Sequence, residues 1–450
     1  MVQLWILEFD ETESRRRTMP KPIVCLCGPL HQYLEAFRSC FRPRQWKYFV
    51  TVLLGLVECE ERRTLSGLLR VVGERICLSG LSRFMNKWPW SPAEVAGVWM
   101  GRYRARMTPI VCVEQARLAA ERPKRVGRPA KTVVTGYLSM DDSVHVKPKG
   151  RKMGGLGKHY STSEQRNVRG HCLFTGLYKL LDQSCPLAVE LYRQRRVCEQ
   201  EGEPFHSKIE MAVSMVERFE PVPGTHTHVL VDSWYHCKAL RKAVQRRHWD
   251  LSGALKSNRV MRLMAADGKR TWLKLSAYAA LLKPEDWTQV IWPSAQGGQT
   301  LYVHCLRTWV RKLGPTRLLI TRHSLEEPRP NVRYWGSTDL ALAPQALVDT
   351  LAQRWSIETF FEDAKDLLGS DHYQLMTATA IVRFWTLIAC LLAFLEEQRA
   401  CQLAQPCSRG EVRRTLQLEH RRNLLRWIAL QLSTGHSIEQ IDAQWTLSSP

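Results

Sequence analysis

The sequence predicts an α/β protein in which a helical domain precedes a mixed sheet, and a β-rich insertion interrupts that sheet. Apolar side chains at three- and four-residue spacing predict helices within residues 29–120. Residues 135–258 alternate apolar strands with amphipathic helices, and residues 259–337 are rich in Trp, Val, Thr and Tyr between turn signals. A chain of 450 residues with 44% hydrophobic side chains can form several such units.

The chain is strongly basic. Its 65 Lys and Arg residues exceed its 43 Asp and Glu residues and give a formal net charge of +22. Such a surplus attracts a polyanion, so nucleic acid is the expected partner, with a solvated basic surface as the alternative. The longest apolar run, Phe384 to Leu395, is too short to span a bilayer, and the amino terminus lacks the order of a secretory signal. We therefore expect no membrane partner and a cytoplasmic location, which in a bacterium means association with the nucleoid.

A basic linker separates the helical domain from the sheet. After an extension over residues 1–28, helices are predicted over residues 45–59, 64–72 and 92–106. Residues 121–134 are dense in Arg, Lys, Pro and Gly without periodicity, which is typical of an extended linker. Arg125 and Arg128 are its candidate DNA contacts. The Gly-Arg-Pro around Arg128 resembles the core of an AT-hook, which inserts Arg into the minor groove, and a linker that touches phosphates is the alternative.

The next segment has the element order of a ribonuclease H-like mixed sheet. Strands are predicted over residues 135–140, 171–180, 186–192, 226–231 and 253–256, and helices over residues 207–219 and 236–248. Beyond the insertion, residues 338–400 complete this domain with a helix from Pro344 to Leu368 and a buried apolar helix over 373–397. Residues 401–450 form a tail with a basic amphipathic helix.

Two acidic residues follow apolar strands. Asp142 and Asp232 are each expected where a buried strand ends, and the carboxyl ends of strands are where open α/β sheets gather active residues. The structural alternatives are a turn at Asp142 and a helix cap at Asp232. Asp141 competes with Asp142, because successive side chains of a strand point to opposite faces and only one of the two can face a given pocket.

A third acid lies on a predicted helix. Arg354, Glu358 and Lys365 are spaced four and seven residues apart, so they share one helix face, with about 10 Å between Glu358 and Lys365 along the axis. A solvated row of ion pairs is the alternative. Glu362 lies one turn after Glu358 and could replace it, but it would break both spacings.

This spacing of Arg, Glu and Lys resembles the signature of bacterial insertion-sequence transposases of the DDE class. Their signature has Tyr three positions before the Arg, where this chain has Leu351. The resemblance covers about residues 137–368 and implies that Asp142, Asp232 and Glu358 are catalytic and bind metal. It favours Asp142 over Asp141, because the residue directly before Ser is the family position.

The chemistry of such enzymes requires charge neutralisation at phosphorus and activation of water or a 3′-hydroxyl. Two Mg²⁺ ions about 4 Å apart supply both, and we expect Mn²⁺ to substitute. Asp142 would bridge the ions, with Asp232 on one and Glu358 on the other. Arg354 is assigned to clamp a phosphate through its planar fork, and Lys365 to a point-charge contact.

Further DNA contacts are predicted around the sheet. The glycine-rich loop after Asp142 is expected to be mobile and to touch DNA, against a plain solvated loop; its candidate contacts are Lys147, Lys149, Arg151 and Lys152. Trp272, Trp287 and Trp292 in the insertion could stack on an extruded base, although most tryptophans in strands are core residues.

The resemblance implies a DNA transposase that cleaves at insertion-sequence ends and transfers the 3′-OH ends to target DNA. It also implies that the amino-terminal helices bind terminal inverted repeats and that a homodimer holds two ends together. A ribonuclease H-like nuclease that cuts without joining, and a transposase-derived DNA-binding protein without catalysis, are the alternatives.

Overall fold

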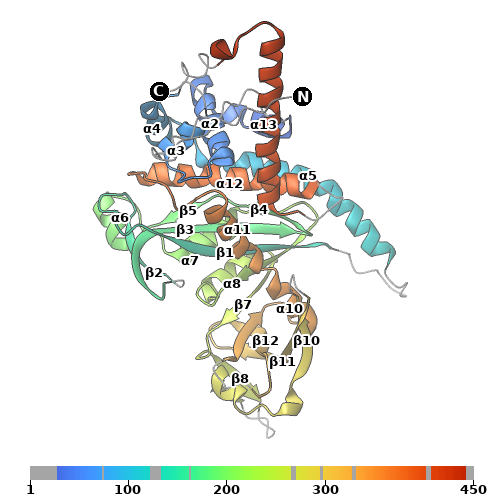
Figure 1. Ribbon diagram of the computed structural model, residues 1–450. Helices are drawn as coiled ribbons and strands as arrows, with labels where there is room; N and C mark the ends of the chain where they lie inside the picture. Colours follow the sequence, from blue (N-terminus) through green and yellow to red (C-terminus); the bar gives the residue numbers. More distant parts are fainter. Residues whose placement is uncertain are drawn as a thin grey trace.

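The computed structural model describes residues 28–72, 76–121, 133–161, 164–264, 270–293, 297–326, 331–401 and 407–441. Figure 1 shows a helical region at the top, the helices α5 and α12 lying across the molecule beneath it, a sheet in the middle and a β-rich lobe at the bottom. The predicted mixed α/β architecture is confirmed.

The amino-terminal region consists of helices. They are α1 (Gly28–Glu35), α2 (Pro43–Glu58), α3 (Leu65–Val71), α4 (Leu78–Asn86) and α5 (Pro92–Ala120). Side-chain caps begin α3 and α5, because Thr64 accepts a hydrogen bond from the amide of Gly67 and Ser91 from that of Glu94, and the Cys77 thiol accepts from Gly80 at the start of α4. The sequence pattern missed α4 and ended α5 too early, since this helix continues through Pro109.

The central sheet is mixed. Its strands are β1 (Thr135–Val146), β2 (Gly157–Ser161), β3 (Arg166–Leu180), β4 (Gln183–Pro186), β5 (Glu190–Tyr192), β6 (His226–Val231) and β7 (Asp250–Leu255). β1 pairs antiparallel with β3 and parallel with β6, and β6 pairs parallel with β7. The helices between these strands are α6 (Arg195–Glu201), α7 (Lys208–Arg218) and α8 (Lys238–Arg246).

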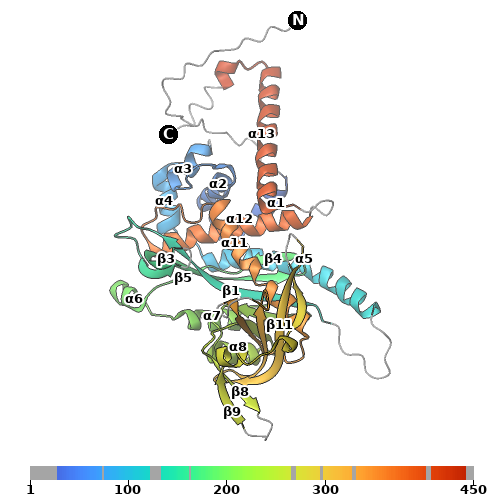
Figure 2. The same cartoon turned by 60° about the horizontal axis from the view of Figure 1, so that its bottom comes forward.

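The insertion extends this sheet instead of forming a separate one. It contains β8 (Val260–Met264), β9 (Arg270–Lys274), α9 (Leu275–Ala279), β10 (Thr288–Trp292), β11 (Gln299–Val310), β12 (Gly314–Arg322) and β13 (Arg333–Ser337). β13 pairs antiparallel with β7, so all strands belong to one 13-stranded sheet. Ten of them run in the order β2-β3-β1-β6-β7-β13-β12-β11-β8-β9, while β10 pairs with β11, and β4 and β5 pair with β3. The insertion therefore interrupts the sequence of the sheet domain, as predicted, but the sheet itself is continuous. β13 forms hydrogen bonds with the backbone groups along the edge of β7. Figure 2 shows this lobe from its lower side.

The carboxyl-terminal third is helical. It comprises α10 (Pro344–Ala352), α11 (Trp355–Asp366), α12 (Ala378–Cys401) and α13 (Arg409–Ser433). The single helix predicted from Pro344 to Leu368 is divided in two, so that Arg354 lies at the start of α11. α12 is long and apolar enough to cross a membrane, but 78% of its most apolar window is buried inside the protein, so it is a core helix.

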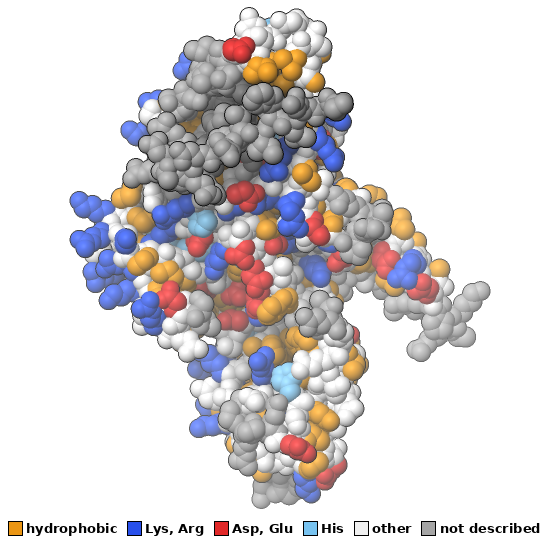
Figure 3. Space-filling view, in the orientation of Figure 1, with side chains coloured by type: hydrophobic (Ala, Val, Ile, Leu, Met, Phe, Trp, Pro, Cys, Tyr) orange, Lys and Arg blue, Asp and Glu red, His pale blue; other side chains and the backbone are white. Residues whose placement is uncertain are grey.

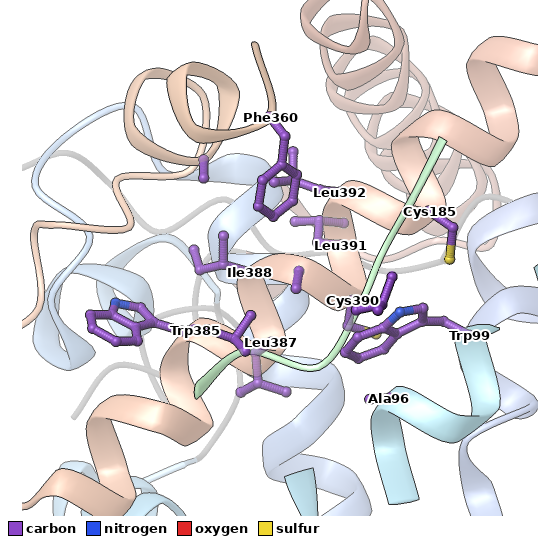
Figure 4. Close-up of a cluster of buried hydrophobic side chains, with 14 of the residues drawn as sticks. Ala96, Trp99, Cys185, Phe360, Trp385, Leu387, Ile388, Cys390, Leu391 and Leu392 are labelled. Atoms are coloured by element: carbon purple, nitrogen blue, oxygen red, sulfur yellow. The ribbon is translucent and has the colours of Figure 1, made fainter. Parts of the chain in front are cut away.

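One hydrophobic core joins the helical region to the sheet. In Figure 4, Phe360 of α11 lies beside Leu392 of α12, and Trp99 of α5 lies beside Cys390. The Trp99 indole also donates a 2.8 Å hydrogen bond to the carbonyl of Pro186 in β4. The core therefore crosses the predicted boundary between the helical domain and the sheet, and it holds both as one support for the residues of the site.

Candidate active site

Asp141 and Asp142 lie within a strand and not at its end. β1 continues to Val146, and Asp142 is paired with Phe174 of β3. The prediction that the strand ends at Asp142 is wrong, because the antiparallel partner β3 supports the chain beyond the acids. Since successive side chains of a strand point to opposite faces, the two carboxylates lie on opposite sides of the sheet.

Asp141 lies next to Asp232. In the parallel pairing of β1 with β6, Met140 is the partner of Val231, and continuing this register by one residue places Asp232 beside Asp141. Neighbouring strands lie about 4.8 Å apart, so two carboxylates at this position repel one another. Burial raises the pKa of Asp141 to about 7, with a further contribution from the charge of Asp232, while Arg354 opposes the shift.

Asp232 follows β6, as the sequence predicts. Its carboxylate accepts hydrogen bonds from the amides of Trp234, at 2.8 Å, and Tyr235, at 3.1 Å. The side chain thus also caps the turn that leads into α8. These bonds hold the carboxylate at the edge of the sheet beside Asp141. The role of Asp232 as a cap is therefore compatible with a role as a catalytic acid.

Arg354 joins the third acid to the first. Its guanidinium donates to Asp141 at 3.2 Å and forms an ion pair with Glu358 one turn along α11. All three side chains are partly buried, with 22% of Arg354, 22% of Asp141 and 30% of Glu358 exposed. α11 contacts β1 and β3, so the helix covers the face of the sheet to which Asp141 points. Asp141, Asp232, Glu358 and Arg354, here called the acid cluster, therefore lie together.

Asp142, the predicted first catalytic acid, lies on the other face of the sheet from Asp141. Its carboxylate accepts hydrogen bonds from the hydroxyl of Tyr235 at 2.5 Å, the ammonium of Lys208 at 2.7 Å and the thiol of Cys172 at 3.1 Å. Burial raises the pKa of Tyr235 and of Cys172, so both remain protonated donors. The pairing of β1 with β6 distinguishes Asp141 from Asp142, and alternation of side chains along the sequence does not reveal this pairing.

The acid cluster has the donor chemistry of a divalent-cation site. Carboxylate oxygens are the ligands that Mg²⁺ and Mn²⁺ prefer. The raised pKa of Asp141 reflects negative charge that a cation would neutralise. Within the described ranges, no three carboxylate, imidazole or thiol groups are close enough together to hold a metal ion as they stand. Arg354 supplies the positive charge between Asp141 and Glu358.

Lys147, which was predicted to contact DNA, has a buried side chain that is bonded inside the protein. The side chain is only 9% exposed, and its ammonium donates to the carbonyls of Asp371 and of Tyr373, the latter at 2.9 Å. It also lies 3.7 Å from the centre of the Tyr373 ring. Burial lowers the pKa of Lys147 to about 8. Its charge is thus used inside the protein, because carbonyls freed between α11 and α12 need donors.

The other predicted DNA contacts have varied surroundings. Lys149, Arg151 and Lys152 are exposed in a turn, and the end of the predicted loop is strand β2, which pairs with β3. Lys365 is half-buried on α11, and its charge lowers the pKa of the buried His145 on β1. Arg125 and Arg128 lie outside the described residues.

Figure 3 shows Lys and Arg side chains gathered at the left margin, over α6 and β2, and acidic side chains near the middle of this face.

The remaining candidates divide by exposure. Trp272 is half exposed on β9, whereas Trp287 and Trp292 are partly buried, with Trp292 packed against Trp335. Leu351, where the transposase signature has Tyr, is buried in a small hydrophobic cluster of the insertion and α10. Glu362 is exposed on α11, away from the ion pair that Arg354 makes with Glu358.

Comparison with known proteins identifies the class. Residues 36–292 match the family described as DDE superfamily endonuclease, and because this is more than half of the chain, the protein belongs to that family. Residues 207–394 match a transposase DDE domain. These matches support a DNA transposase, and transposase DDE domains generally use divalent metal ions.

One solved structure is similar at low identity. It is the piggyBac transposase synaptic complex with hairpin DNA, with 10% sequence identity and a TM-score of 0.45. The similarity covers 91% of this chain and 77% of that chain. Among curated proteins, none matches this chain.

Proposed function

We propose that this protein is a DNA transposase whose catalytic carboxylates are Asp141, Asp232 and Glu358. The observation that carries the assignment is the register of β1 and β6, which sets Asp141 beside Asp232 on the face covered by α11. Arg354 then links Asp141 to Glu358. We assign the first catalytic position to Asp141 and not to Asp142, because the Asp142 carboxylate is bonded to Tyr235 and Lys208 on the opposite face.

The proposed fold is ribonuclease H-like. The antiparallel strands β2, β3 and β1, followed by β6 and β7 parallel to β1, support this assignment. The acids stand on two neighbouring strands and on a helix that packs on them. Rigid elements of this kind hold carboxylates at fixed separations, which hydrolysis of a phosphodiester requires.

The three carboxylates would hold divalent cations, with Mg²⁺ the proposed ion and Mn²⁺ its substitute. When bound, such ions neutralise charge on the phosphate and activate water or a 3′-hydroxyl. Asp141 must be deprotonated to serve as a ligand, and its pKa is raised to about 7, so metal binding is expected to weaken below this pH. Arg354 holds Asp141 and Glu358 in place, and its planar fork has the geometry to bind phosphate oxygens.

The biological substrate we propose is an insertion-sequence end. Cleavage there would be followed by transfer of the 3′-OH ends to target DNA, with the helices α1 to α5 binding the terminal inverted repeats. We further propose a homodimer acting in the bacterial cytoplasm. The net charge of +22 supports binding to DNA.

The decisive experiment measures Mg²⁺-dependent cutting and joining of duplexes that carry the element's own ends. The wild type is compared with Asp141→Asn and Glu358→Gln, and Glu362→Gln on the same helix is the matched control. We expect cutting to vanish in the first two variants while end binding persists, and the control to cut normally. Binding without cutting by the wild type would favour the non-catalytic DNA-binding alternative, and cutting without joining would favour a nuclease.

A further inference from the structure

A cavity of about 240 Å³ lies between the amino-terminal helices and the segment that connects α11 to α12. Its walls come from the start of α3, from α4, and from residues 373–375. Several polar side chains line it: Arg63, Thr64, Ser66, Ser82 and Gln374. The cavity is separate from the acid cluster, with which it shares no residue.

Arg63 is a buried cation without a partner. The residue is only 4% exposed, and its Nε is buried without a hydrogen bond. Among the residues that the structure describes, neither a carboxylate nor a carbonyl forms a hydrogen bond or ion pair with its guanidinium. Its backbone amide does bond to the ring of His372, which fixes the main chain at the cavity wall. Burying an unpaired charge is costly, so the site as described lacks a component.

Three other buried arginines have hydrogen-bond acceptors for their guanidinium groups. Arg383 donates to three carbonyls, those of Phe84, Met85 and Trp90. Arg413 donates to two carbonyls and to the carboxylate of Glu60, and Arg241 donates to Thr316 and to the carbonyl of Pro315. Arg63 is equally buried and lines the cavity, yet its Nε has no hydrogen-bond acceptor among the described residues.

Positive charge dominates the surroundings of the cavity. Burial lowers the pKa of His372, Asp371 raises it, and Arg63, Arg62 and Lys147 lower it further, so three cations and one carboxylate lie around this ring. The charge of Glu60 acts to raise the pKa of Arg63, whereas burial and the charge of Arg413 lower it, and the Glu60 carboxylate is bonded to Arg413 and to Gln417. Cations outnumber carboxylates around the cavity, so an anion is the ligand that the cavity would attract.

We propose that this cavity binds a phosphate group, with Arg63 as its principal ligand. A guanidinium fork donates two parallel hydrogen bonds to phosphate oxygens. The hydroxyls of Ser66 and Ser82 and the side-chain amide of Gln374 line the same space and add donors. The phosphate comes either from the DNA backbone or from free inorganic phosphate. The DNA source rests on the proposed function, whereas the free-phosphate source does not.

The first experiment titrates the full chain with inorganic phosphate by calorimetry. Wild type is compared with Arg63→Met and Arg63→Lys, and with Arg62→Met, which removes the same charge from the exposed neighbouring residue. We expect phosphate affinity to fall about tenfold or more in Arg63→Met, less in Arg63→Lys, and less than about twofold in Arg62→Met. Equal phosphate binding by wild type and Arg63→Met would overturn the proposal.

Thermal denaturation without added anion gives an independent readout. Because the unpaired cation is costly, Arg63→Met should melt at the same temperature as the wild type or higher, and phosphate should raise the melting temperature of the wild type alone. If Arg63→Met instead melts lower and gains as much from phosphate as the wild type does, Arg63 is a structural residue and the proposal fails.

A binding assay with duplex DNA distinguishes the two sources of phosphate. If a backbone phosphate occupies the cavity, Arg63→Met weakens duplex binding and inorganic phosphate competes with DNA for the wild type. If duplex affinity is unchanged while phosphate binding is lost, free phosphate is the ligand; both outcomes support the site. Each assay measures binding and not cutting, so an inactive wild type would contradict the proposed function but leave this inference intact.

Discussion

Tyr235 donates a 2.5 Å hydrogen bond from its hydroxyl to Asp142, on the face of β1 opposite Asp141. The backbone amide of the same residue bonds to the carboxylate of Asp232 at 3.1 Å. The ring is buried against Phe174 of β3. Tyr235 therefore connects the strand that carries Asp141 to the turn that carries Asp232.

Tyr235→Phe tests whether this connection positions the acids. The variant keeps the ring and the backbone bond but leaves the carboxylate of Asp142 with one donor fewer. We expect the Mg²⁺ concentration for half-maximal cutting to rise about tenfold, with DNA affinity unchanged, because residues that hold metal ligands affect metal binding to this extent. Tyr160→Phe, on an exposed tyrosine, is the control. Identical Mg²⁺ dependence in wild type and Tyr235→Phe would argue against a positioning role.

The two adjacent aspartates should differ sharply in their effect on activity. Asp141→Asn removes a member of the acid cluster, and we expect cutting to fall on the order of a thousandfold or more. Asp142→Asn keeps an acceptor for Tyr235 and loses only the charge opposite Lys208, so measurable cutting should remain. Initial rates on the same duplex at saturating Mg²⁺ check this. The reverse ranking would return the catalytic role to Asp142.

The raised pKa of Asp141 makes a prediction about stability. The folded pKa of about 7 lies above the unfolded value near ~4, so ionising this group opposes folding, and the cost grows from pH ~4 and is complete above pH ~7. Without metal, Asp141→Asn should therefore be more stable than the wild type at pH 8, by up to about 4 kcal/mol for a shift of roughly three pKa units, with a smaller difference at pH 5. Thermal denaturation in chelator at both pH values measures this. A difference in stability between the two proteins that does not depend on pH would show that ionisation of Asp141 does not oppose folding.

Lys147 should contribute to the stability of the fold, and Lys149 to DNA binding. Lys147→Met removes the donor that serves the carbonyls of Asp371 and Tyr373, so the free energy of unfolding should fall by about 1–3 kcal/mol. The folded variant should bind DNA as the wild type does. Lys149→Met removes an exposed charge two residues away and should weaken DNA binding without loss of stability. Denaturant titration and duplex binding of both variants separate the two roles; weaker DNA binding by folded Lys147→Met would restore the original prediction.

Local patterns in the sequence were sufficient for much of the fold. The strands β1, β3 and β6, the helices α7 and α8, the acid after β6, and the shared helix face of Arg354 and Glu358 follow from periodicity and spacing over a few residues. The strand β2 and the helix α6 were missed, and β4 and β5 were predicted as one strand. These features depend on contacts within one element or between neighbours along the chain. The division between α10 and α11, and the length of β1, lay beyond such patterns, because distant partners determine where those elements end.

By itself the sequence predicted that acids at two strands and one helix, in a basic chain, belong to one site. Only the tertiary structure decided that Asp141 and not Asp142 faces Glu358, because that choice depends on the register between β1 and β6, strands separated by about ninety residues. It also decided that Lys147 is buried and that Arg63 lines a cavity with its Nε unbonded among the described residues. A residue type specifies what chemistry a side chain can perform; the packing of elements that are distant in sequence decides what it faces.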